Sequence, residues 1–146
     1  EIFLFLVAFF SFYLAFAGKR FAQNRKGKAS IVDWIALGLV ISAGLGMWVL
    51  AIFYYMENNS HYITLTTFGF IAIALGYTDY KTYIQQEATG KKRIARHLTN
   101  MLAGTIAVVT AVLVVNVDTE PQWLPWILPT VILVPLIIWW NWKIMK

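Results

Sequence analysis

His97 and Asn100 are the polar side chains best placed to do chemistry, because both follow a basic segment and open a long apolar run. An imidazole can ligate haem iron, and a b-type haem takes two histidines on facing helices at one depth. The only other histidine, His61, is expected on the opposite side of the bilayer, roughly 30 Å away across the hydrocarbon. His97 would therefore need a second ligand from residues before Glu1. We favour a polar anchor that binds a loop, Asp79, Asp33 or a lipid phosphate, and keep a haem b or quinone site as the alternative.

Two carboxylates, Asp33 and Asp79, are predicted at the same depth as His97. A charge inside the membrane would indicate a proton or ion path, but both residues lie near the ends of apolar runs. We therefore expect helix caps and interfacial ion pairs, with Arg96 or His97 as partners.

The segment 91–116 has two unlike faces when it is read as a helix at 100° per residue. One arc of about 60° holds small and polar residues, and the opposite side is bulky and aliphatic. We expect the first face to pack against protein, with Gly104 and Ala107 buried, and the second, including Ile106 and Val109, to face lipid. On this face we expect Asn100 to make a hydrogen bond to another helix. Asn116 lies at the far end of the segment. The small and polar arc contains His97, Asn100, Gly104, Ala107 and Ala111.

Catalysis by this chain alone is not expected. The sequence contains no nucleophile–base pair, phosphate-binding loop, glycine-rich dinucleotide turn or cluster of metal ligands. Cysteine is absent, which excludes disulfides and thiolate metal sites.

The elements that must position these side chains are membrane helices. The 146 residues are 60% hydrophobic and 13% charged, whereas a soluble domain is nearer half apolar and a quarter charged. The sequence predicts one all-α domain, an integral membrane bundle of five transmembrane helices. The expected spans are 2–17, 31–55, 63–80, 98–117 and 123–142.

Local signals mark how these spans begin and pack. Ser30 with Asp33 predicts an N-terminal capping box. Gly38, Ser42 and Gly46 recur every four residues and predict a seam for close helix approach, as do Ala72 and Gly76. In the last span, Pro129 and Pro135 predict kinks.

Charge is distributed unevenly over the loops. If the five spans alternate, all twelve Lys and Arg residues fall on one side. The positive-inside rule then makes the basic loops cytoplasmic. This distribution favours anchoring of the topology over nucleic-acid binding, although the net charge is +5.

Several segments resemble the C-terminal part of an uncharacterised family of bacterial multi-span membrane proteins. They are Phe12–Arg20, Asp33–Trp34, Arg96–Asn116 and Leu124–Thr130, with Pro135 and Trp139–Trp140 after them. The resemblance implies the bacterial cytoplasmic membrane and further helices upstream of Glu1. It matches Arg96, His97, Asn100 and Asn116 without assigning them a role, and it implies no activity.

We expect a non-enzymatic membrane protein, an accessory or scaffold subunit whose partners are the lipid bilayer and either other membrane proteins or further copies of itself. The first alternative is a redox module that holds haem or quinone through His97. The second is a small transporter that uses the proline-broken last span.

Overall fold

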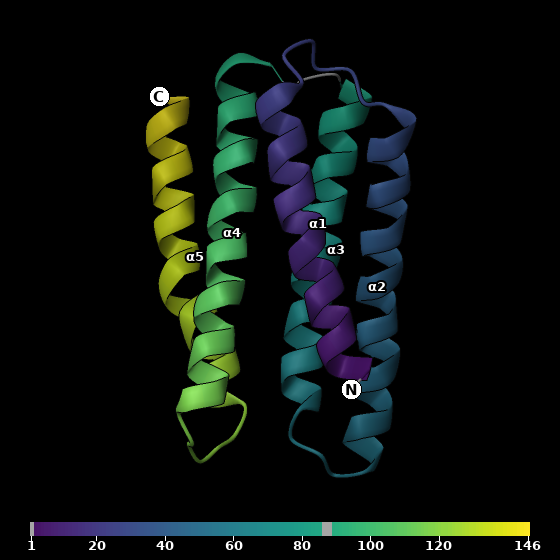
Figure 1. Ribbon diagram of the computed structural model, residues 1–146, viewed down its shortest axis with the longest axis vertical. Helices are drawn as coiled ribbons and strands as arrows, with labels where there is room; N and C mark the ends of the chain where they lie inside the picture. Colours follow the sequence, from purple (N-terminus) through teal and green to yellow (C-terminus); the bar gives the residue numbers. More distant parts are fainter. Residues whose placement is uncertain (1, 86–88) are drawn as a thin grey trace.

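The computed structural model describes residues 2–85 and 89–146, and in these residues the chain is all-helical, with five helices and no strand (Figure 1). The predicted all-α bundle is confirmed. The helices are α1 (Ile2–Gln23), α2 (Ile31–Met56), α3 (Tyr62–Gln85), α4 (Gly90–Asn116) and α5 (Leu124–Met145).

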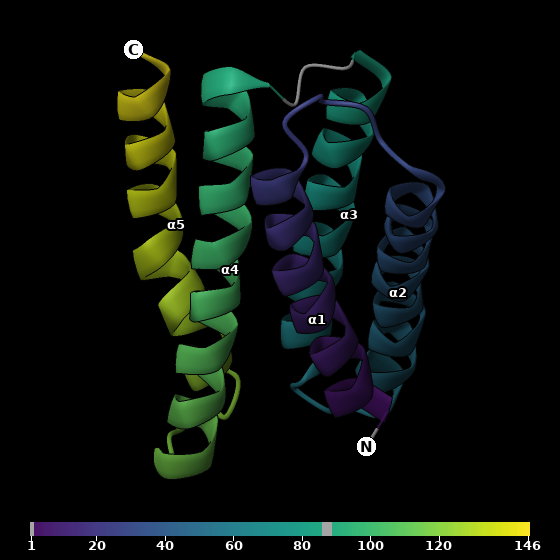
Figure 2. The ribbon, with the colours of Figure 1, turned by 45° about the horizontal axis from the view of Figure 1, so that its top comes forward.

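The helices run up and down, so that successive connections lie at opposite ends of the bundle (Figures 1 and 2). The connection between α1 and α2, the N-terminus of α4 and the C-terminus of the chain lie at one end, which we call the basic end. The Lys and Arg residues of the chain belong to the helix ends and connections at this end. The predicted segregation of charge along the bundle is therefore built into the fold.

The helices contact one another unevenly. α2 packs extensively on α3, α1 packs on both α4 and α2, and α5 packs mainly on α4. Contacts between α3 and α5 are few. The helices therefore form an incomplete ring that is loosely closed between α3 and α5.

Helix boundaries extend beyond the predicted spans at the basic end. α1 continues to Gln23, α3 to Gln85, and α4 begins at Gly90, seven residues before His97. Polar residues near an interface form helix as readily as apolar ones, so hydropathy underestimates helix length. The N-cap at Ser30 is confirmed, since the Ser30 amide donates to Asp33 Oδ2 at 2.8 Å.

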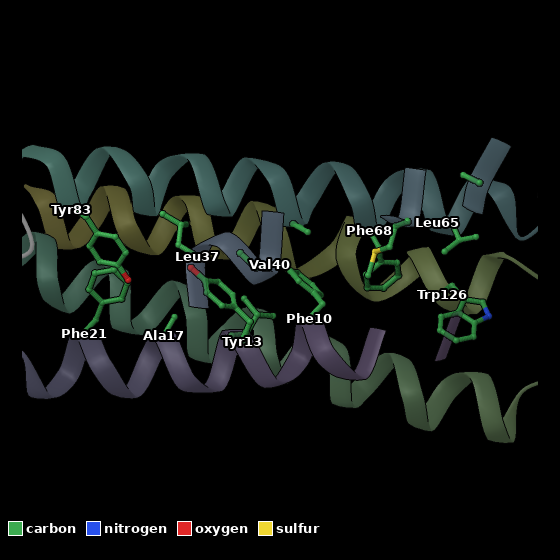
Figure 3. Close-up of a cluster of buried hydrophobic side chains, with 14 residues drawn as sticks. Phe10, Tyr13, Ala17, Phe21, Leu37, Val40, Leu65, Phe68, Tyr83 and Trp126 are labelled. Atoms are coloured by element: carbon green, nitrogen blue, oxygen red, sulfur yellow. The ribbon is translucent and has the colours of Figure 1, made fainter. Parts of the chain in front are cut away.

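The core lies between α1, α2 and α3, with Trp126 from α5 at the far end (Figure 3). The buried side of α1 follows a helical period and consists of Phe10, Tyr13, Leu14, Ala17 and Phe21. Phe21 stacks on Tyr83 with ring centroids 5.8 Å apart, and Phe10 meets Phe68 edge to face at 6.2 Å.

The predicted seam of Gly38, Ser42 and Gly46 on α2 does not pack against another helix among the described residues. A Cβ added at Gly38 or Gly46 would meet no atom within 4 Å, and Ser42 is exposed. The close approach uses Gly44 instead, where an added Cβ would lie 2.9 Å from Ile73 of α3. The predicted small pair of α3 does pack, because Ala72 and Gly76 are both buried.

The expected burial of Gly104 is also wrong. This glycine is half-buried, and an added Cβ would meet nothing within 4 Å. The buried residues of α4 are Asn100, Ile106 and Thr110, although Ile106 was expected to face lipid. Because α4 is covered by α1 on one flank and α5 on the other, its buried face is rotated from the arc of smallest residues.

Four of the described helices, α1, α2, α4 and α5, are long and apolar enough to cross a membrane. α3 is as long but more polar, with several threonines and Asp79 along it. Its polar side chains Thr64, Asp79 and Thr82 are buried in the bundle. α5 runs through Pro129 and Pro135 and changes direction part-way along, as its prolines predict (Figure 2).

Candidate functional site

Polar side chains from four helices meet at the basic end of the bundle, and we call them the basic-end cluster. Its members are Tyr13 and Arg20 of α1, Asp33 of α2, Asp79 of α3, and Arg96, His97 and Asn100 of α4. The sequence predicted five of these seven residues, and each predicted one lies at this end.

Asp79 is the most deeply buried charge of the cluster, with 1% of its surface exposed. The Tyr13 hydroxyl donates to its Oδ2 at 2.6 Å. Arg96 Nη1 lies 3.9 Å from its Oδ1, which accepts no hydrogen bond from the described residues. Since α3 continues for another six residues to Gln85, Asp79 lies inside the helix rather than at its end. It is an internal link between α1, α3 and α4.

Asp33 has the capping role that the sequence predicted, with a different ionic partner. Its carboxylate accepts from Arg20 Nε at 2.7 Å and from Arg20 Nη2 at 2.8 Å, a bidentate pair. Arg20 also donates to the Ser30 hydroxyl at 2.8 Å. The expected pairing of Asp33 with Arg96 or His97 is therefore wrong, because Arg20 at the end of α1 faces the start of α2.

His97 points toward α1. Its Nδ1 lies 2.7 Å from the carbonyl oxygen of Gly18. Because a carbonyl only accepts, Nδ1 carries a proton in this contact. The partner of His97 is therefore a backbone group of α1. It is neither Asp79 nor Asp33, which were expected to bind this imidazole.

Asn100 lies one turn further along α4 and is 1% exposed. Its Nδ2 donates to the Arg96 carbonyl of its own helix at 3.1 Å, and its Oδ1 has no partner among the described residues. The expected hydrogen bond to another helix is absent there. Asn100 instead packs closely on Gly18, where an added Cβ would lie 3.2 Å from the Asn100 Cβ.

Asn116 is separate from the cluster. It is the last residue of α4, at the other end of the bundle, and its Nδ2 donates to the Val112 carbonyl of the same helix. It is exposed, and among the described residues it has no hydrogen bond to another helix.

Two arginines of the basic segment donate to backbone carbonyl groups of other helices. Arg96 donates to Thr78 O at 3.2 Å, and Arg93 donates to Ala22 O at 2.5 Å. Ala22 is in the last turn of α1, where carbonyls lack helical partners. Part of the predicted membrane anchor therefore ties α4 to α3 and α1.

Sequence reasoning missed Tyr13 and Arg20. A signal for Tyr13 was present: a phenol in the middle of an apolar span requires a hydrogen-bond partner. Arg20 had no comparable signal, because five basic residues between 19 and 28 are equivalent by composition. Only the turn from α1 into α2 selects Arg20.

The two histidines are far apart, as the sequence predicted. His61 precedes α3 at the end away from the basic end, where its ring meets that of Trp126 at 6.3 Å. His97 offers one open nitrogen, so a haem there would need its second ligand from outside the described residues. Within residues 2–85 and 89–146, no three His, Asp or Glu side chains are grouped to hold a metal ion.

Comparison with protein-family models, curated proteins and solved structures finds no match to this chain. The resemblance to an uncharacterised bacterial membrane protein family therefore stays a prediction.

Proposed function

We propose that this chain is a non-enzymatic accessory or scaffold subunit, which docks onto another membrane protein through the outer face of α2. The observation that carries the proposal is the stripe of Gly38, Ser42 and Gly46, which none of the other described helices covers.

The stripe has the properties of a helix-docking surface. It lies opposite the buried side of α2, which includes Val40 and Met47. Ser42 donates its hydroxyl to the Gly38 carbonyl at 2.8 Å, so the stripe presents no unsatisfied hydroxyl. Small residues four apart allow the backbones of two membrane helices to approach closely.

The polar residues of the basic-end cluster support a structural role. Tyr13, Arg20 and Asp79 bind groups on other helices of the same chain, and so does His97 through Nδ1. Polar groups that join helices inside a bundle specify its packing, which suits a subunit that presents a fixed surface.

We place the chain in the bacterial cytoplasmic membrane with five spans and the basic end in the cytoplasm. The charge distribution supports this orientation. Thr64, Asp79 and Thr82 of α3 are buried in the bundle, which supports a fifth span beside the four more apolar helices.

The test is the size of the assembly in polymer discs cut directly from the native membrane. The wild-type chain should run as part of a complex larger than one chain, by light scattering. The double variant Gly38→Leu, Gly46→Leu should run as a single chain with an unchanged melting temperature, since both positions are open. Gly104→Leu, at an open glycine of α4, is the matched control and should keep the complex. A wild-type protein that runs as one chain, or a double variant that keeps the complex, would contradict the proposal.

A redox module is the second candidate, and one observation favours it. The Nδ1 contact to a backbone carbonyl is the arrangement that orients a ligating histidine and leaves Nε2 open. An absorption spectrum of the protein in native-membrane discs tests whether the chain binds haem, and so whether it is a haem-containing redox module. A Soret band that His97→Ala removes supports the redox module, and a spectrum without one removes haem.

A further inference from the structure

An aromatic hollow lies between α2 and α3 at the end of the bundle away from the basic end, near the connection that joins these two helices (Figure 1). It has a volume of about 430 Å³. Its lining comes from both helices and consists of Trp48, Ala51, Ile52 and Tyr55 of α2 with Tyr62 and Thr66 of α3.

Three aromatic rings form the walls of the hollow. Trp48 and Tyr55 lie seven residues apart on one face of α2, about 10 Å along the helix axis. Ala51 lies between them, and its small side chain leaves the space open. Tyr62 meets Tyr55 edge to face with ring centroids 5.2 Å apart. The two tyrosines therefore form one wall, and Trp48 forms the other.

The Trp48 wall is held in place by α3. Its Nε1 donates to the Thr66 carbonyl at 3.2 Å, and its ring lies against Gly69, where an added Cβ would be 2.5 Å from the Trp48 Cδ1. The Thr66 hydroxyl donates to the Tyr62 carbonyl at 2.8 Å. The indole N–H and this hydroxyl are both used within the chain, so the hollow presents ring faces to a ligand rather than these donors.

The charge at this end of the bundle favours a cation in the hollow. Glu57 is the C-cap of α2 and follows Tyr55 by two residues. The C-terminus of the helix adds a partial negative charge of its own. The Lys and Arg residues of the chain belong to the basic end, so an anionic group here would find no cation among them. Aromatic ring faces attract cations, most strongly those of Trp and Tyr.

We propose that this hollow binds a small quaternary ammonium ion such as choline, with its methyl groups against Trp48, Tyr55 and Tyr62. A quaternary ammonium has no N–H to satisfy, which suits a site walled by ring faces. The occupant is the free ion rather than the choline headgroup of a phospholipid, because Glu57 would repel the phosphate. The hollow shares no residue with the α2 stripe, so the proposal does not depend on docking through that stripe.

The experiment is saturation-transfer NMR of the protein in a maltoside detergent, which contains no ammonium group. Choline is compared with dimethylbutanol, its neutral carbon isostere. The wild-type protein should bind choline about five-fold more tightly than dimethylbutanol, because the ring faces attract the charge and not the neutral carbon. Phosphocholine should bind more weakly than choline.

Substitutions in the walls test whether the rings provide this preference. Tyr55→Leu should weaken choline binding about five-fold and leave dimethylbutanol binding unchanged, whereas Tyr55→Phe keeps the ring and should bind choline like the wild type. Trp48→Leu should have the same effect as Tyr55→Leu. Trp140→Leu, at an exposed tryptophan of α5 outside the hollow, is the matched control and should keep the preference.

Absence of choline binding, equal affinity for choline and dimethylbutanol, or a preference that survives Tyr55→Leu would each overturn the proposal. So would loss of the preference in Trp140→Leu, which would place the binding outside the hollow. Phosphocholine that binds as tightly as choline would assign the hollow to a phospholipid headgroup and overturn the choice of a free ion.

Discussion

The Tyr13 hydroxyl is the one hydrogen-bond donor that the described residues offer to the Asp79 carboxylate. Tyr13→Phe removes that donor and leaves the ring in place, so the loss is confined to the hydroxyl. A buried acceptor without its partner costs about 1–3 kcal/mol. We therefore expect Tyr13→Phe to lower the free energy of unfolding by that amount, measured by SDS titration in mixed micelles.

Tyr55→Phe is the control for this change, because Tyr55 is exposed and its hydroxyl has no hydrogen bond among the described residues. It should be neutral. In the background Asp79→Asn, the cost of Tyr13→Phe should also change, since residues in one network are not additive. Additive losses would show that the two side chains are not coupled.

Two substitutions, His97→Ala and His97→Asn, test whether His97 stabilises the fold as a polar anchor. The asparagine amide can still donate to the Gly18 carbonyl, whereas alanine cannot. For an anchor, His97→Ala should cost about 1 kcal/mol of unfolding free energy and His97→Asn should restore most of it. If His97→Asn is as unstable as His97→Ala, the contact to Gly18 does not stabilise the fold.

At this scale the sequence identified the right polar residues and few of their partners. Residue types and depth were enough to place Asp33, Asp79, Arg96, His97 and Asn100 at one end. The partners depend on helix rotation, which depth does not determine. Asp33 binds Arg20 rather than Arg96 because the short turn after α1 brings them face to face.

At the scale of the helix, glycines provide a direct test of which faces pack. Gly76 is buried, and an added Cβ would lie 2.8 Å from Ile41 of α2. Gly76→Leu should therefore overpack the contact between α2 and α3 and cost about 1–3 kcal/mol. Gly104→Leu, at an open position, should leave the melting temperature in detergent unchanged. Equal melting temperatures for the two variants would refute the assigned faces.

The same comparison explains why sequence reasoning placed the helices but misjudged their faces. In water, apolar residues mark the buried side of a helix; in lipid, both sides are apolar and this contrast is lost. Small residues are then the main indication of which face packs against another helix. In α2 this indication is ambiguous. This helix carries small residues on both sides, with Gly44 against α3 and Gly46 on the open stripe.

At the scale of the whole molecule, α3 decides the topology, because it is the helix too polar to qualify as a span by composition. It is also packed extensively on α2, and its polar residues Thr64, Asp79 and Thr82 are buried. Lipid would therefore meet its apolar side chains, such as Phe70 and Ile84, which are exposed. A helix shielded in this way can cross the bilayer although its composition is more polar than that of the other four helices.

Single-cysteine labelling tests this topology cleanly, because the chain has no native cysteine. Asn58 and Thr89 flank α3 at its two ends, so they lie on opposite sides of the membrane only if α3 crosses it. In intact cells an impermeant maleimide should label Asn58→Cys, and it should label Thr89→Cys only after permeabilisation. Lys26→Cys, in the basic connection between α1 and α2, should behave like Thr89→Cys. Labelling of both Asn58→Cys and Thr89→Cys in intact cells would show that α3 does not cross the membrane, and the reverse pattern would invert the orientation.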